Sequence, residues 1–507
     1  MRLGARLSNA ERAPSRRATR AIMLGSARIF AGEAGLRGAC SRFSDTLLVR
    51  MLLSWLVVVA ACSSPGAKQT PAAAHDVTVF DGARLITGDG SAPIENSAFI
   101  IENNAFAGVG KRGELQVPAG ARHVDLTGKT VMPAMVDLHS HLGFLKQSDG
   151  SMSKENFNRE NILDHLNRYA YHGFAAVISS GTDMGELPYQ LREEKHPNAA
   201  LFRTVGRGLA WPGSGPFDPA RNDVPYSVTT EEEARAAVRD LAPHHPDFVK
   251  IWVDDRNGRQ KKLTPPLYTA AADEAHKQNL RAIAHVFDLE DAKGLVRAGV
   301  VGFMHLVRDA DIDEELIALL KQHPGVFFGP NIGITSRGLE AGRPEWLDAP
   351  LLHETIPPSQ IQKLEQSFTN RKPEVLARTR EDWERAKRNI AKLRANGVTM
   401  ALGSDSAGDP SRTLGWHAIW EVESLAAAGI PPMEVITMST KIPAEILKLN
   451  QLGTVAKGKA ADFIVLDANP LDNMSNIRRI SDVYLRGRAV DRAAMRARWK
   501  AEWTKGS

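Results

Sequence analysis

The most informative residues of this chain are metal-binding side chains in or just after short apolar segments. His139 and His141 close the segment V-D-L-H-S-H at residues 136–141. Residues i and i+2 of a strand project from the same face, so both imidazoles can reach one metal ion. The pattern alone is a weak signal, because the chain contains 15 His and a pair of surface histidines would look the same.

Lys250 lies within the apolar segment F-V-K-I-W-V at residues 248–253. Lysine is almost never fully buried without a partner, because removing its ammonium group from water is costly. Either this strand end opens onto a polar site, or the lysine is chemically modified. The ordinary alternative is an edge lysine whose amine reaches solvent.

His285, His305 and Asp405 raise the same question in three further apolar segments. Singly, each has an ordinary explanation, as a hydrogen-bonded core histidine or as a carboxylate that caps a helix. With the other three residues they make six metal-competent groups at or near the ends of five apolar segments. Their joint occurrence predicts one metal-dependent active site.

Eight apolar runs must position these groups, and they alternate with amphipathic helical stretches between residues 133 and 445. This pattern predicts an α/β fold in which parallel strands, buried on both faces, form a (β/α)₈ TIM barrel. Such barrels place their active sites at the C-terminal ends of the strands. The predicted strands are residues 131–138, 175–179, 201–205, 248–253, 282–287, 301–306, 326–329 and 398–403.

Two connections are longer than the rest and follow the C-terminal ends of predicted strands. Residues 206–226 are rich in Gly and Pro, whereas residues 331–396 are largely helical and charged. We expect substrate contacts in such segments, although loop aromatics often only pack and loop charges often only face solvent. Arg308 has the guanidinium geometry to hold a substrate carboxylate with two hydrogen bonds. The candidate contacts are Arg308, Asn331, Tyr226 and Trp211.

The apolar run at residues 51–61 follows Arg50 and ends at Cys62. It is shorter than the roughly 20 residues that span a bilayer, but it fits the apolar part of a secretory signal. The sequence V-A-A-C resembles the lipobox of bacterial lipoproteins, in which the Cys becomes lipidated. We therefore expect residues 1–61 to be a signal segment and residues 62–75 a lipidated tether. The protein would then face the periplasm of a bacterial envelope, anchored in the outer membrane.

The residues before Arg50 fit no signal peptide, and a start at Val49 would give a compact one. Residues 1–61 also carry ten Arg and three acidic residues, so the +5 net charge of the chain leaves −2 for the remainder. Charge therefore gives no reason to expect a nucleic acid partner. The expected partners are a small-molecule substrate and the membrane, through Cys62, and a homo-oligomer is left open.

Taken together, these residues resemble the metal-dependent amidohydrolase superfamily, in its imidazolonepropionase-like and prolidase-like branch. The resemblance rests on residues 128–141, on Lys250, His285, His305 and G-S-D at 403–405, and on L-G-T-V-A-K-G-K-A-A-D at 452–462. It implies a barrel at residues 133–445, a small β-sandwich built from residues 76–132 plus 446–490, and a helical tail at residues 491–507. One departure is Ala134, where the family usually has Gly.

The resemblance also implies a ligand set. His139, His141 and Asp405 would hold one ion, His285 and His305 a second, and a carboxylated Lys250 would bridge them. The ions would be two Zn²⁺, with Mn²⁺, Fe²⁺ or Co²⁺ as alternatives, although mononuclear members exist. A divalent ion activates water at neutral pH, and Asp405 would move the proton.

The expected activity is hydrolysis of amide C–N bonds, with dipeptides or N-acyl amino acids as substrates. One alternative is a hydrolase of cyclic amides or lactones. A lipoprotein that only binds a ligand is the remaining alternative, and the complete ligand set argues against it.

Overall fold

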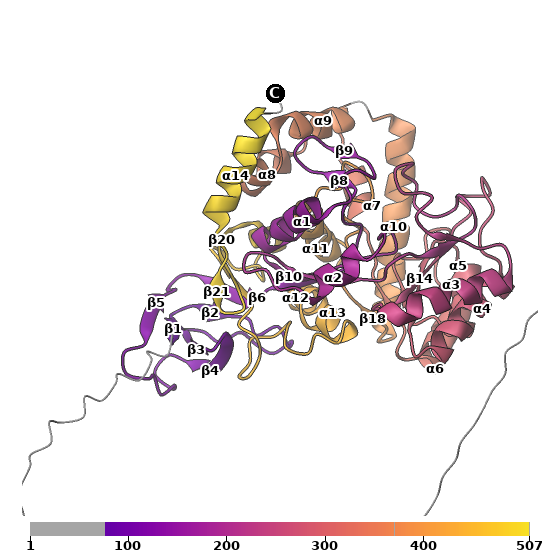
Figure 1. The fold of residues 1–507 in the computed structure, drawn as a ribbon. Helices are drawn as coiled ribbons and strands as arrows, with labels where there is room; N and C mark the ends of the chain where they lie inside the picture. Colours follow the sequence, from indigo (N-terminus) through magenta and orange to yellow (C-terminus); the bar gives the residue numbers. More distant parts are fainter. Residues whose placement is uncertain (1–76, 370, 506–507) are drawn as a thin grey trace, which may run out of the picture. The chain divides into compact units, whose positions relative to one another are not determined.

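The computed structural model describes residues 77–505 apart from Asn370 (Figure 1). The predicted signal segment, the tether and Cys62 therefore lie outside the described residues. Within the described part of the chain, no helix is both long and apolar enough to cross a membrane.

A strand occurs in every apolar run that the sequence predicted, usually with fewer residues than the run. All of these strands are parallel to their barrel neighbours. The barrel strands are β7 (Met135–Ser140), β10 (Phe174–Ser179), β11 (Leu201–Thr204), β14 (Val249–Val253), β15 (Ala282–Val286), β16 (Gly302–Phe303), β17 (Phe327–Phe328) and β18 (Thr399–Met400).

The first predicted run, residues 131–138, is wrong as a single strand. It divides at Ala134 into β6 (Thr130–Pro133) and β7, which belong to different sheets. The hydrogen-bond partners change at this point, because the amide of Ala134 donates to Asp462 O (3.0 Å) and the next amide, of Met135, donates to Gly173 O (2.9 Å). The chain therefore passes from the sandwich into the barrel here.

Strands β7, β10 and β11 form one sheet, whereas β14 to β18 form a second sheet together with the short strands β12 (Leu209–Ala210) and β13 (Tyr226–Ser227). Backbone hydrogen bonds join the two sheets at both of their shared edges, between β7 and the segment after β18 and between β11 and the segment before β14. At one edge Leu138 N donates to Leu402 O (3.0 Å), and at the other Asp247 N donates to Thr204 O (3.0 Å). The parallel strands thus form the TIM barrel of the prediction.

Helices connect the strands and bury their apolar faces against them. Helix α3 (Glu231–Leu241) begins with a capping box, in which Thr230 Oγ1 accepts from Glu233 N (3.2 Å) and the Glu233 carboxylate accepts from Thr230 N (3.0 Å). The other connecting helices are α1 (Arg159–Tyr171), α2 (Leu187–Glu193), α4 (Pro265–Lys277), α5 (Leu289–Arg297), α6 (Glu314–Gln322), α11 (Trp416–Ala427), α12 (Pro432–Ser439) and α13 (Lys441–Ile446).

The long connection between β17 and β18 is helical, as its sequence predicts. It contains α7 (Gly333–Gly338), α8 (Pro350–Thr355), α9 (Pro358–Thr369) and α10 (Pro373–Ala395). The last helix of the chain, α14 (Arg492–Lys505), contacts α1, because Trp499 Nε1 donates to Asp164 Oδ1 (2.6 Å) and its ring lies under the guanidinium of Arg168.

Two sheets outside the barrel enclose a separate apolar cluster. Strand β6 pairs with β19 in antiparallel register, Val131 opposite Val465, so segments from both ends of the barrel share one sheet. Buried aromatic rings fill the cluster, with Phe463 and Tyr484 stacked at 4.6 Å. The strands are β1 (Thr78–Asp81), β3 (Ser97–Glu102), β4 (Ala105–Lys111) and β5 (Arg122–Asp125) in one sheet, and β2 (Arg84–Leu85), β6, β19 (Phe463–Leu466), β20 (Ile480–Leu485) and β21 (Arg488–Ala489) in the other.

Candidate active site

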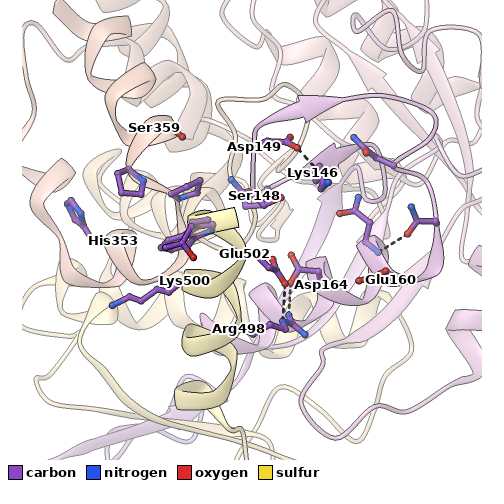
Figure 2. A pocket seen from close by; sticks show the side chains of 18 residues that line it. Lys146, Ser148, Asp149, Glu160, Asp164, His353, Ser359, Arg498, Lys500 and Glu502 are labelled. Atoms are coloured by element: carbon purple, nitrogen blue, oxygen red, sulfur yellow. Dashed lines mark hydrogen bonds and ion pairs between the residues drawn. The ribbon is translucent and has the colours of Figure 1, made fainter. Parts of the chain in front are cut away.

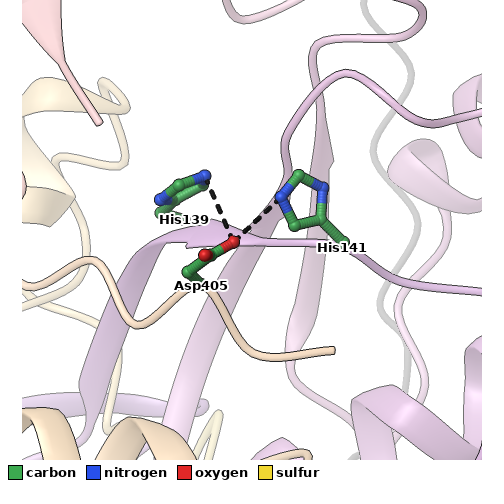
Figure 3. A group of neighbouring side chains, drawn as sticks. All are labelled: His139, His141 and Asp405. Atoms are coloured by element: carbon green, nitrogen blue, oxygen red, sulfur yellow. Dashed lines mark ion pairs between the residues drawn. The ribbon is translucent and has the colours of Figure 1, made fainter. Parts of the chain in front are cut away.

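His139, His141 and Asp405 meet at the C-terminal ends of the first and last barrel strands (Figure 3). Asp405 Oδ1 lies 3.0 Å from His141 Nε2 and 3.7 Å from His139 Nε2. All three residues are buried, and one ligand atom from each lies within 4.8 Å of the others. Asp405 has a φ of +57°, a left-handed conformation that Asp tolerates. Its amide donates to His139 O (2.6 Å), which fixes it beside the histidines.

The other three predicted residues join this group from the neighbouring strands. Lys250 Nζ lies 3.5 Å from His139 Nε2, and the side chain of Lys250 is fully buried. The rings of His285 and His305 lie 4.4 Å apart, and His305 lies 5.0 Å from His139. The structure therefore brings all six side chains together at one end of the barrel.

Burial decides the protonation of the histidines. It lowers the pKa of His141 to about 4, and it lowers the pKa values of His139 and His305 well below the ordinary range. It lowers the pKa of His285 as well. A neutral imidazole is the form that binds a metal ion, so this cluster is already in its ligating form at neutral pH.

Asp405 and Lys250 respond to burial in opposite ways. Burial alone raises the pKa of Asp405, but the Arg412 guanidinium and the two nearby imidazoles bring that pKa well below its ordinary value. Asp405 is therefore an anion that accepts a charged hydrogen bond from Arg412. Burial lowers the pKa of Lys250 to about 7, so a large fraction of its amine is neutral and nucleophilic at neutral pH.

Imidazole nitrogens and a carboxylate oxygen are the donors that Zn²⁺ and similar divalent ions prefer. His139, His141 and Asp405 supply three of them from buried, neutral or anionic groups. The residues present therefore fit a divalent metal ion.

A hydrogen-bond network fixes the ligating residues. Asp137 accepts from His139 N (3.0 Å), from Ser404 N (3.0 Å) and from the Tyr169 hydroxyl (2.8 Å), and so joins β7 to the segment that carries Asp405. His285 Nε2 lies 3.3 Å from Asp254 Oδ2. Such partners set the orientation and the tautomer of a metal-binding histidine.

Asn331 was predicted as a substrate contact, and the structure places it elsewhere. Its side chain is fully buried, its Oδ1 lies 2.9 Å from His305 Nδ1, and its Nδ2 donates to Ser404 O (2.7 Å). The next two amides, of Ile332 and Gly333, donate to the buried Glu421 carboxylate. Asn331 therefore positions a histidine and does not face the pocket.

A cavity of about 350 Å³ opens beside the cluster. His141, His285, His305 and Asp405 line it. Arg308, predicted as a substrate contact, lines this cavity, packs over the Phe287 ring at 4.2 Å and donates to Asn331 O (3.2 Å).

Tyr226 and Trp211 do not line this cavity. The Tyr226 hydroxyl donates to Asp240, and the Arg207 guanidinium lies 3.9 Å from the centre of its ring. Trp211 instead lies under the amine of Lys261, at 5.1 Å. Partners hold both aromatic rings away from the pocket: Arg207 lies in the same loop, Asp240 in α3, and Lys261 between β14 and α4.

Arg221, Arg256 and Arg412 also line the cavity and were not among the residues predicted from the sequence. An arginine in a loop is normally solvent-exposed, so its type and spacing gave no signal. The available hint was the unusual length of residues 206–226, which contain Arg221.

A second, larger cavity of about 1170 Å³ lies away from this cluster, between α14, the start of α1 and the segment before α9 (Figure 2). Its lining mixes cations such as Arg498 and Lys146 with anions such as Asp164 and Glu502, and several of these pair with one another. None of the six clustered residues lines it. The chemistry therefore belongs to the smaller cavity.

The amidohydrolase family model matches residues 130–490. The chain belongs to the amidohydrolase family. It is therefore a hydrolase that acts on C–N bonds, and its family is metal-dependent.

Two curated relatives are similar to the chain over most of their length. The chain is 25% identical to imidazolonepropionase of Streptomyces griseus over 407 residues, which are 76% of this chain and 91% of the relative. It is 23% identical to 5-methylthioadenosine/S-adenosylhomocysteine deaminase of Halalkalibacterium halodurans over 429 residues, which are 77% of this chain and 85% of the relative.

Solved structures share the fold. A Xaa-Pro dipeptidase with bound methionine has a TM-score of 0.62 at 21% identity, covering 82% of this chain and 99% of the other. The A. niger ochratoxinase has a TM-score of 0.63 at 18% identity, covering 82% of this chain and 95% of the ochratoxinase. At these identities the likeness supports the TIM barrel with its additional domain.

Proposed function

We propose that this amidohydrolase cleaves the amide bond of dipeptides or N-acyl amino acids. The observation that carries the proposal is the convergence of four neutral imidazoles, an anionic carboxylate and a partly neutral amine in one cluster, three of whose imidazoles and whose carboxylate line a small cavity. Fold relatives include a Xaa-Pro dipeptidase, which adds support for an amide substrate.

In this proposal His139, His141 and Asp405 hold one divalent ion, and His285 and His305 hold a second. A bound divalent ion supplies a water of lowered pKa and polarises the substrate carbonyl. Asp405, kept anionic by Arg412, accepts the proton of the attacking water and delivers it to the leaving nitrogen. Arg412 thereby tunes the base through its ion pair with Asp405.

Lys250 completes the proposed ligand set as a carbamate. Its neutral amine attacks carbon dioxide, forms an N–C bond and releases one proton, which leaves an anionic oxygen in place of a buried cation. The low pKa of Lys250 and its 3.5 Å approach to His139 support this step. We propose two Zn²⁺ ions, with Mn²⁺, Fe²⁺ or Co²⁺ as alternatives.

The proposed substrate class is tested with a panel of Xaa-Pro dipeptides, N-acyl amino acids, cyclic imides and lactones, assayed with Zn²⁺ or Mn²⁺. Release of an amino acid from the first two classes supports the proposal. Turnover restricted to cyclic substrates favours a cyclic-amide or lactone hydrolase instead, an alternative supported by the imidazolonepropionase relative. If no compound of the panel is hydrolysed, both the amide hydrolase and the cyclic-amide or lactone hydrolase are contradicted, and a protein that only binds a ligand is favoured.

We also propose that the mature protein is anchored to the envelope membrane by a lipid on Cys62 and acts on a small molecule there. Intact-mass measurement of the protein from its native host tests this proposal. A mature N-terminus at Cys62 with the mass of added acyl chains is expected, and a mature N-terminus upstream of Cys62 contradicts it.

A further inference from the structure

Arg221 is a buried cation with no matching anion. Only 2% of its surface is exposed, yet it lines the cavity that holds His141 and Asp405. Among the described residues, its Nε and Nη1 have no hydrogen-bond partner, and no carboxylate lies within ion-pair distance of it. Its Nη2 donates to Gly408 O, which fixes the side chain against the loop that follows the last barrel strand.

Neighbouring acidic groups do not neutralise this guanidinium. Asp405 and Asp409 both form ion pairs with Arg412, and Asp405, Asp218 and Asp409 act on Arg221 only from beyond ion-pair distance. Burial lowers the pKa of Arg221 to about 10, so the side chain remains charged at neutral pH. An unpaired buried charge opposes folding, and such costs are concentrated at functional sites.

The rest of the cavity wall carries both signs of charge, but its three carboxylates have partners: Asp405 pairs with Arg412, Asp288 with Lys262, and Asp254 lies 3.3 Å from His285 Nε2. The cations without a partner therefore favour an anionic ligand. Arg308 and Arg256 also line it, and neither forms an ion pair among the described residues. The guanidinium of Arg256 lies over Phe217, an exposed ring at the rim of the cavity, at 4.8 Å. Arg221 differs from both because two of its donors are buried and unused.

We propose that Arg221 is the carboxylate anchor of the substrate, so that the enzyme prefers amides whose leaving amine carries a free carboxylate. A guanidinium offers two parallel N–H groups to a carboxylate, either from Nη1 and Nη2 or from Nε and Nη2. In Arg221 one N–H of Nη2 donates to Gly408 O, so its other N–H can form such a pair with the unused Nη1 or Nε. Arg308 lies beside His305 on another part of the wall and can contact the acyl side. This inference rests on the proposed function and restricts it to free acids, as opposed to neutral amides and lactones.

Binding of matched acid and amide probes tests the inference separately from catalysis. The probes are the N-benzoyl derivatives of glycine, leucine and proline, each as the free acid and as the primary amide. Calorimetry with the metal-loaded protein gives their dissociation constants, and KM replaces them for any pair that is hydrolysed. We expect the acids to bind at least tenfold more tightly than the amides. Tighter binding of the acids without hydrolysis of any probe, together with no turnover in the substrate panel above, would contradict the proposed function and leave the carboxylate anchor standing.

Variants assign the preference to one residue. Arg221→Met is expected to abolish the preference for acids, and Arg221→Lys to retain part of it, because the charge remains while the paired donors are lost. Arg207→Met is the matched control in the same loop, since Arg207 stacks on Tyr226 outside the cavity, and its preference should stay within twofold of the wild type. Equal binding of acids and amides by the wild type overturns the inference, as does a preference that survives Arg221→Met. If Arg221→Met does not fold, an unchanged preference in Arg221→Lys overturns it as well.

Discussion

The carboxamide of Asn331 fixes the tautomer of His305. Its Nδ2 donates to Ser404 O (2.7 Å), so its Oδ1 must be the atom that faces His305 Nδ1 at 2.9 Å. His305 Nδ1 therefore carries the proton, and its Nε2 is left with the lone pair that a metal ion needs. The segment between β17 and α7 thus orients a ligand carried by β16.

Replacing Asn331 with Ala should weaken metal binding without removing a ligand. Loss of such a partner typically lowers metal affinity about 10- to 100-fold. Competition for Zn²⁺ with a chromophoric chelator measures the change. Asn389→Ala is the matched control, because Asn389 is equally buried and donates to Val307 O and Ala310 O. It should lower stability and leave Zn²⁺ affinity unchanged, and equal affinity losses in both variants would argue against a role in orienting His305.

Removal of the metal should destabilise the folded protein. The cluster buries several polar groups that a bound ion would satisfy, and a ligand at 1,000 times its dissociation constant adds about 4 kcal/mol to the free energy of unfolding. We expect chelator treatment to lower the thermal midpoint and added Zn²⁺ to restore it. In His141→Ala, which loses one proposed ligand, the chelator should have a much smaller effect. A midpoint that is identical with and without chelator in the wild type would contradict a metal centre here.

The number of bound ions should depend on Lys250. As a carbamate this residue would supply an anionic oxygen, so Lys250→Ala should lower the metal content from two ions per chain to one. Short carboxylic acids such as formate or acetate should restore part of it, because they fill the vacated space with an anionic oxygen. Elemental analysis of purified protein gives the stoichiometry.

A second buried lysine provides the control for that experiment. Lys293 forms ion pairs with Glu290, Asp313 and Glu315, which explains its burial without any modification. Lys293→Arg keeps a cation among these three carboxylates and should therefore retain two ions. An unchanged content of two ions in Lys250→Ala would count against the bridging carbamate.

The convergence of the six clustered side chains could be predicted because the C-terminal ends of all strands in a parallel barrel lie at the same end of the barrel. A histidine or lysine at the end of an apolar run is recognisable in the sequence, because it is polar and its neighbours in the run are apolar. Parallel strands then bring such residues to the same end, as they do for His139, Lys250 and His285.

Loop side chains could not be placed by the same reasoning, because a loop has no periodicity from which to read direction. Tyr226 and Trp211 lie in the expected loop but contact Arg207 and Lys261. Arg221, from the same loop, is the residue that reaches the cavity. It donates a hydrogen bond to Gly408 O, nearly two hundred residues away in sequence, and no local pattern predicts that contact.

Because of Asp183, the free energy of unfolding should decrease as pH rises from about 4 to about 7. This carboxyl is buried at the end of β10, where the Ser179 hydroxyl (2.6 Å) and the Thr204 hydroxyl donate to it, and burial raises its pKa from 3.8 to about 7. The folded protein therefore keeps a proton that the unfolded chain releases near pH 4. The contribution is fully present below pH 4 and is lost as pH rises through about 7, with an upper limit of about 4 kcal/mol.

Asp183→Asn removes this titration, so its free energy of unfolding should lack that decline. Urea denaturation at pH 4.5 and at pH 8 measures the free energy of unfolding of both proteins. From pH 4.5 to pH 8, the wild type should lose several kcal/mol more of this free energy than the variant does. Asp223→Asn, a change at an exposed carboxylate that pairs with Lys154, should follow the wild-type curve within about 0.5 kcal/mol. If the Asp183→Asn curve is also parallel to that of the wild type, Asp183 is ionised in the folded protein across this range and its burial does not hold the proton.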